Sequence, residues 1–81
     1  MKTYDFVINE KNVHIILKKE NNTPVFRSSC EGRTFYSCVA KRNDTFYLLV
    51  DRGIVGVGMW SDDQVALVQM AKDFDEMKGG N

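Results

Sequence analysis

The chain contains 81 residues, 11 of them basic and 11 acidic, so its formal net charge is zero. That length allows one small domain with a limited core, and hydrophobic and charged fractions of 43% and 27% are ordinary for a globular protein. No apolar run approaches the ~18 residues of a transmembrane helix, and the N-terminus lacks the apolar region of a signal peptide, so we expect a cytoplasmic protein that does not bind membranes.

Six stretches of the chain, about ten residues apart, have the composition and alternation typical of β-strands. They cover residues 4–8, 13–18, 25–30, 34–40, 45–50 and 54–59. Turn-forming residues separate them at 9–12, 31–33, 43–44 and 51–53. Pro24 precedes the third stretch, where a missing N–H does least harm to a sheet. Connections this short favour an antiparallel meander, because parallel strands need long crossovers.

A single helix is predicted from about residue 62 to residue 78. Ser61 is a suitable N-cap, and Gln64 three residues later completes the pattern of a capping box. Trp60 and Val65 occupy the flanking positions of a hydrophobic staple. Apolar residues then recur at helical spacing, at Val65, Leu67, Val68, Met70, Ala71, Phe74 and Met77. Gly79 is expected to end the helix.

These elements predict an α+β fold, in which an antiparallel five- to six-stranded meander sheet carries one C-terminal helix packed on one face. We expect residues 1–81 to form a single domain, with the strands within about residues 2–60. Residues 1–60 hold nine basic and six acidic residues, whereas residues 61–81 hold two basic and five acidic ones. The positive excess over the sheet is too small to indicate nucleic-acid binding, which usually shows a concentrated basic footprint.

The hairpin registers predict which side chains share a face of the sheet. A two-residue turn at 43–44 places Val39 opposite Leu48 and Cys38 opposite Leu49. One face then carries Phe35, Val39, Phe46, Leu48, Val50, Ile54, Gly56, Gly58 and Trp60, and the two glycines suggest that the helix packs there. The other face carries Tyr36, Cys38, Ala40, Tyr47, Leu49, Val55, Val57 and Met59.

Both faces are apolar over the last three strands, yet the sequence supplies one helix to cover them. A helix is about 10 Å wide, whereas six strands spaced ~4.8 Å apart span close to 29 Å. We therefore expect the second face to bind a partner, because exposed apolar patches usually mark interaction surfaces. The predicted contact residues are Tyr36, Tyr47, Leu49, Val55, Val57 and Met59. The alternative is that the sheet curls and buries both sets of side chains internally.

The two cysteines do not have the spacing of a redox pair or of half a zinc site. A three-residue turn at 31–33 places Cys30 opposite Thr34 and Cys38 opposite Phe26. The two thiols are then offset along the ladder and too far apart for a disulfide. We expect both to be buried and reduced.

The remaining chemistry is sparse. His14 is the sole histidine, and nothing in the sequence places it beside a cysteine, so we predict no catalytic residues and no metal site. Residues 53–58 are rich in glycine, but their order is wrong for a dinucleotide fingerprint and the lysine of a P-loop is absent. No cofactor is predicted.

We therefore expect a small non-enzymatic protein-binding module, with a protein partner or a second copy of itself as its ligand. The concrete form of this hypothesis is an inhibitor of a larger host assembly, of the kind that phages encode. The alternative is a small nucleic-acid-binding protein, in which basic turn residues act together with the strand tyrosines. Its predicted contacts are Arg33, Lys41, Arg42 and Arg52. A third hypothesis is a small enzyme that uses His14 with a cysteine.

Overall fold

The computed structural model describes residues 2–51 and 63–79. Its elements are β1 (Lys2–Ile8), β2 (Lys11–Glu20), β3 (Thr23–Cys30), β4 (Arg33–Arg42), β5 (Thr45–Asp51) and α1 (Gln64–Gly79). The strands form one antiparallel sheet in the order β1-β2-β3-β4-β5. This confirms the predicted α+β fold, an antiparallel meander with a C-terminal helix. The sixth predicted strand, 54–59, lies outside the described residues.

Two-residue turns join all four strand pairs. Their central residues all have positive φ: Asn9 and Glu10 (52° and 64°), Asn21 and Asn22 (51° and 65°), Glu31 and Gly32 (50° and 77°), and Asn43 and Asp44 (50° and 64°). This is the conformation of type I′ turns, whose twist matches that of the strands they join. Asn, Asp and Gly tolerate positive φ, which explains why polar pairs punctuate the chain at these four points.

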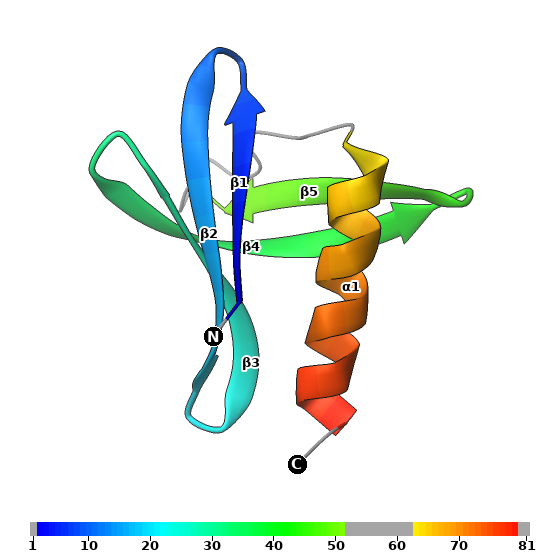
Figure 1. The fold of residues 1–81 in the computed structure, drawn as a ribbon. Coiled ribbons are helices and arrows are strands. Elements are labelled where there is room, and N and C mark those ends of the chain that lie inside the picture. Colours follow the sequence, from blue (N-terminus) through cyan, green and yellow to red (C-terminus); the bar gives the residue numbers. More distant parts are fainter. Residues whose placement is uncertain (1, 52–62, 80–81) are drawn as a thin grey trace.

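The sheet is strongly curled (Figure 1). β1 and β2 form a long hairpin, β4 and β5 cross it at a large angle in this view, and β3 bends between the two pairs. α1 packs on the inner face, which we define as the side of the sheet that contacts the helix. The buried core on this side consists of Phe6, Ile8, Val13, Ile15, Leu17, Phe26, Cys30, Leu48, Leu67 and Met70.

The predicted faces of β4 and β5 are confirmed. Val39 pairs with Leu48 and Cys38 pairs with Leu49, as the turn at 43–44 requires. Leu48 is fully buried and Val39 packs against the core, so the helix covers the face that was predicted to receive it. The sheet curls, as the alternative to an uncovered sheet required, and this lets one helix serve the inner side of all five strands. The curl does not bury both sets of side chains, because Tyr36 and Tyr47 remain exposed on the other face.

The predicted register between β3 and β4 is wrong by one residue. The turn contains Glu31 and Gly32 alone, so Cys30 pairs with Arg33 and Phe26 pairs with Ser37. A shift of one residue reverses the face of every side chain relative to the partner strand. Cys30 therefore lies on the inner face and Cys38 on the outer face, which excludes a disulfide between them more firmly than an offset would.

The start of the helix differs from the prediction. Asp63, not Ser61, is the N-cap: its Oδ1 accepts a hydrogen bond from the Ala66 N–H (3.2 Å) and its carbonyl accepts one from Leu67 (3.0 Å). Gln64 is consequently the first helical residue, and its side-chain amide pairs with Phe46 of β5. Trp60 and Ser61, the other partners of the predicted staple and capping box, lie outside the described residues. The helix ends at Gly79, one residue beyond the predicted end at Lys78.

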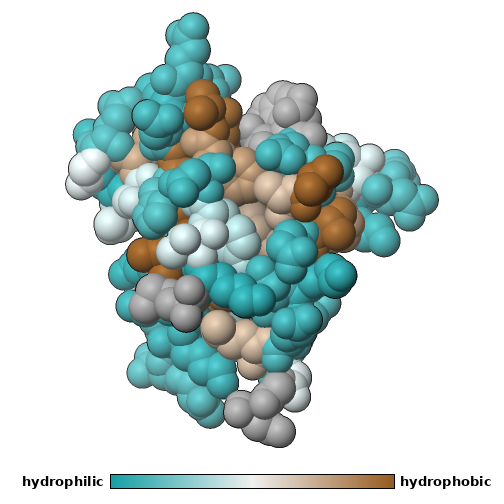
Figure 2. Space-filling model, viewed as in Figure 1, coloured by the Kyte–Doolittle hydropathy of each residue, from teal (hydrophilic) through white to brown (hydrophobic). Residues whose placement is uncertain are grey.

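Along α1, Leu67 and Met70 are buried and Phe74 and Met77 pack against the core, as the apolar spacing predicts. Val65 and Val68 do not join them, since their exposed fractions are 84% and 40%. On the side of the molecule shown in Figure 2, hydrophobic patches are small and are interrupted by hydrophilic residues. The described helix is too short and too polar to span a membrane.

Candidate functional site

The outer face of β4 and β5, on the side of the sheet away from α1, carries the predicted partner-binding residues that the structure describes. Tyr36 and Tyr47 have exposed fractions of 45% and 36%. Leu49, which lies between them, and Ala40, which lies opposite Tyr47, are half-buried. The cross-strand pair Ala40 and Tyr47 places a small side chain opposite a large one, which leaves the tyrosine ring standing above the sheet. Val55, Val57 and Met59 lie outside the described residues.

Two neighbouring strands hold Tyr36 in place. Its hydroxyl donates a hydrogen bond to Glu20 Oε1 on β2 (2.8 Å), and the guanidinium of Arg27 on β3 lies 4.2 Å from the ring centroid. Arg27 Nε is also 3.4 Å from Glu20 Oε2. The hydrogen bond to the carboxylate raises the pKa of Tyr36, partly opposed by the positive charge of Arg27. The row of three side chains fixes the rotamer of an exposed aromatic ring.

The basic residues proposed for nucleic-acid binding are not brought together. Arg33 begins β4 and Lys41 and Arg42 end it, so roughly 25 Å of extended strand separates the two ends. Lys41 Nζ lies 5.5 Å from the Phe46 ring centroid and 3.9 Å from Asp44 Oδ1. Arg52 lies outside the described residues.

The structure also separates His14 from both thiols. His14 is on the outer face of β2, where its Nδ1 is 2.7 Å from Asp5 Oδ1 of β1. Cys30 is buried on the inner face, and Cys38 is exposed, which corrects the expectation that both thiols are buried. Ser29 pairs with His14, but its hydroxyl donates to the His14 carbonyl (3.5 Å), so within residues 2–51 and 63–79 no nucleophile bonds to the ring.

The most unusual polar group of the described core is the Asp73 carboxylate, a residue for which the sequence predicted no role. Asp73 is only 4% exposed, on the buried side of α1. Its Oδ1 accepts hydrogen bonds from Lys2 Nζ and Gln69 Nε2 (2.9 Å each), and its Oδ2 accepts one from the Tyr4 hydroxyl (2.7 Å). These four residues, the Asp73 cluster, join the first strand to the last helix. The only sequence signal was an acid between the apolar positions Met70 and Phe74.

Burial and hydrogen bonding shift the titration of this cluster in opposite directions. Burial alone raises the pKa of the Asp73 carboxyl, but the hydrogen bonds from Tyr4, Lys2 and Gln69 outweigh it, so the pKa lies below its usual value. Burial, and then the bond to Asp73, raise the pKa of the Tyr4 hydroxyl strongly. The hydrogen bond to Asp73 raises the pKa of Lys2. Each group is stabilised in one protonation state, which is typical of a structural cluster.

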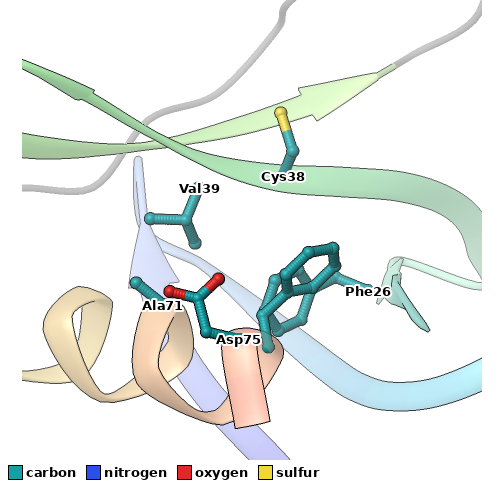
Figure 3. Close-up of a pocket in the computed structure, with 6 residues that line it drawn as sticks. Phe26, Cys38, Val39, Ala71 and Asp75 are labelled. Carbon is teal, nitrogen blue, oxygen red and sulfur yellow. The ribbon is translucent and has the colours of Figure 1, made fainter. Parts of the chain in front are cut away.

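A pocket of about 370 Å³ opens where β3 and β4 separate (Figure 3). Phe26 lines it from β3, Cys38 and Val39 from β4, and Ala71, Phe74 and Asp75 from α1. In Figure 3 the Asp75 carboxylate points toward Val39, and the Cys38 sulfur points away from the other labelled side chains. Within residues 2–51 and 63–79, no group of three or more His, Cys, Asp or Glu side chains converges to hold a metal ion.

No family model matches this chain, and neither a curated protein nor a solved structure matches it.

Proposed function

We propose that this protein is a non-enzymatic protein-binding module that docks a partner through the outer face of β4 and β5. The observation that carries the proposal is the pair of exposed tyrosines, Tyr36 and Tyr47, on one side of a sheet whose other side is covered by α1. Tyrosine is enriched at the centres of interfaces, because it combines a large apolar ring with a polar end.

The rigidity of Tyr36 supports this proposal. A side chain that is already fixed by Glu20 and Arg27 loses little conformational entropy when a partner covers it. Tyr47 has only a short neighbour opposite it, at Ala40, so its ring is accessible from above the sheet. The half-buried Leu49 adds apolar area beside both rings.

The titratable groups also favour binding over catalysis. Among the described residues, the resolved pKa shifts belong to Lys2, Tyr4, Tyr36 and Asp73, and each of these groups is engaged in a hydrogen bond. None of the four lines the pocket between β3 and β4. A cytoplasmic setting is part of the proposal, since two free thiols suit a reducing compartment.

The test is the molar mass in solution by light scattering, alone and with lysate proteins from the native host. We expect wild-type protein to form a species heavier than the monomer, and the double variant Tyr36→Ser with Tyr47→Ser to remain a folded monomer. The matched control is Val65→Ser, which removes a more exposed apolar side chain from α1 and should leave the complex intact. A complex that survives the tyrosine variant, or fails with the valine variant, contradicts the proposal.

A salt titration separates protein binding from nucleic-acid binding. Complexes held by phosphate contacts weaken steeply with added salt, because each contact releases counterions. We expect the complex formed through Tyr36 and Tyr47 to show a shallow dependence on salt, and no binding to a single-stranded oligonucleotide. A steep slope together with oligonucleotide binding would favour the nucleic-acid alternative.

A further inference from the structure

β3 and β4 separate in the middle of the sheet. Their ladder ends at the pair Phe26 and Ser37, although β4 continues for five more residues, from Cys38 to Arg42, which pair with β5. β3 likewise runs on from Phe26 back to Thr23, paired with β2. Figure 1 shows β3 turning away from β4. We call this opening the fork.

Pro24 explains where the ladder stops. In the register of β3 and β4, the next pair toward the fork with hydrogen bonds between these strands would join Pro24 to Val39. Proline has no N–H to donate, so that pair cannot form as it does at Phe26 and Ser37. The same alternation directs the main-chain groups of Val39 and Lys41 away from β5 and into the fork. Among the five described strands, none pairs with β4 on this side at Val39 and Lys41, so β4 has a short open edge there.

The pocket described above lies at the point where the fork begins. Its floor is apolar and rigid, because the rings of Phe26 and Phe74 stack with centroids 5.4 Å apart and an interplanar angle of 28°. Val39 and Ala71 add aliphatic surface from the two sides. A side chain that projects from a strand paired with β4 would reach this floor.

Asp75 gives the pocket a charge. Its carboxylate is exposed at the surface of α1 and points toward Val39 (Figure 3). Among the described residues it has no salt bridge or hydrogen bond, in contrast to Asp73 two residues earlier, which has three donors. A negative group beside aromatic and aliphatic walls suits a side chain with an apolar stem and a positive end.

We propose that the fork binds an extended segment of a partner protein, which adds a strand to β4 at Val39 and Lys41 and inserts a Lys or Arg side chain toward Asp75. Strand addition is a common mode of peptide recognition, in which main-chain hydrogen bonds hold the peptide and a pocket selects one side chain. A small-molecule amine could pair with Asp75, but it would leave the main-chain groups of β4 unpaired, so a peptide fits this site better. Cys38 lines the pocket and also belongs to the outer face, but neither Tyr36 nor Tyr47 lines the pocket, so this site stands whether or not the tyrosines bind a partner.

The first test selects binders from a displayed library of seven-residue random peptides. We expect wild-type protein to enrich peptides with a Lys or Arg flanked by residues that favour strands, and Asp75→Asn to bind these peptides at least tenfold more weakly. The matched control is Glu76→Gln, which removes an exposed acid from the same helix without touching the pocket. The absence of enrichment, enrichment without a basic residue, or equal loss in both variants overturns the proposal.

The second test asks whether the peptide pairs with β4. Addition of an enriched peptide to ¹⁵N-labelled protein should shift the amide resonances of Val39 and Lys41, and should slow alkylation of Cys38, the exposed thiol at the fork. N-methylation of the peptide bonds that face β4 should abolish both effects. A bound peptide that leaves these amides unshifted, or tolerates N-methylation, overturns strand addition. The double variant Tyr36→Ser with Tyr47→Ser should bind the peptide normally, which separates this site from the outer face.

Discussion

Asp73 is a buried acid that depends on three donors for its stability in the core. Hydrogen bonds to a charged carboxylate stabilise the folded state more than hydrogen bonds between neutral groups do. A buried donor that loses its acceptor destabilises the fold, because the cost of its desolvation is no longer offset. Lys2 and Tyr4 come from β1 and Gln69 from α1, so a single substitution affects two elements. Substitution of Asp73 alone therefore measures how much the cluster contributes to stability.

The substitution Asp73→Asn should lower the free energy of unfolding by about 2 kcal/mol at pH 7, since it removes the charge and one of the two acceptor oxygens. Urea denaturation followed by circular dichroism measures this value. Asp75→Asn, an exposed acid on the same helix, should change stability by no more than about 0.5 kcal/mol. Equal effects of the two substitutions would show that Asp73 is not a structural acid.

The difference between wild type and Asp73→Asn should also depend on pH. The pKa of Asp73 is lower in the folded protein than its ordinary value of 3.8, so the unfolded chain takes up the proton first as the pH falls. The contribution of the carboxylate is therefore complete above that value and is lost progressively below it. The two denaturation midpoints should converge as the pH is lowered from 5 to 2.

Glu10 occupies a position that suits asparagine. Its φ is 64°, within 1° of the value of Asn22 at the same place in the next turn. A side chain such as Glu is strained in this left-handed conformation, whereas Asn tolerates it. Glu10→Asn should therefore raise the free energy of unfolding by about 0.5–1 kcal/mol. Glu10→Ala removes the same charge but keeps the strain, so a similar gain from alanine would attribute the effect to charge.

At the scale of elements, the sequence determines more of the sheet than of the helix ends. Alternation in β2 and the residues Asn43 and Asp44 correctly predicted the faces and the β4–β5 register. The register between β3 and β4 was predicted wrongly because glutamate is unusual at positive φ, so the turn at Glu31 and Gly32 looked one residue longer than it is. The pattern around Ser61 suggested an N-cap, but Asp63 has the same chemistry two residues later.

The role of Gln64 could not be read from local sequence, because its partner is 18 residues away. Its Nε2 donates to the Phe46 carbonyl (2.8 Å) and its Oε1 accepts from the Phe46 N–H (2.9 Å). The side-chain amide thus pairs with β5 as a neighbouring peptide group would, and ties the start of α1 to the sheet. The Asp73 cluster is equally non-local, and so is the fork, since each depends on how distant segments meet.

This pairing predicts a conditional effect of Gln64→Glu. At pH 7 the carboxylate cannot donate to the Phe46 carbonyl, and the stability should fall by about 1–2 kcal/mol. A protonated carboxyl restores one donor and one acceptor in nearly the same geometry, so folding should raise the pKa of this glutamate. The stability deficit of Gln64→Glu relative to wild type should therefore shrink as the pH falls below about 5. Gln64→Ala has no proton to gain, and its deficit should stay constant over the same range.

At the scale of the whole molecule, the curl of the sheet and the contact between β1 and α1 depend on each other. A five-stranded sheet that stayed flat would leave β1 far from a helix that packs on β4 and β5. The curl brings the start of β1 to the middle of α1, where the Asp73 cluster joins the two elements. Asp73 is thereby connected to Tyr4 and Lys2, which lie 69 and 71 positions away in the sequence. The cluster should therefore report on global unfolding.

The alkaline limb of the stability curve tests that connection. The pKa of Tyr4 is raised far above its ordinary value of 10.0 in the folded protein, so above that pH the unfolded chain loses the tyrosine proton while the folded chain keeps it. Stability must then fall as the pH rises, by up to about 1.4 kcal/mol per pH unit for one proton.

Tyr4→Phe lacks this proton, although it should be less stable than wild type by about 1 kcal/mol at pH 9 because the bond to Asp73 is gone. The two proteins share every other titrating group that faces the cluster, including Lys2, so the difference between their urea midpoints isolates Tyr4. We expect that difference to close between pH 9 and pH 11. Parallel curves over this range would mean that the hydroxyl is open to water, and that the curl does not hold β1 against the helix.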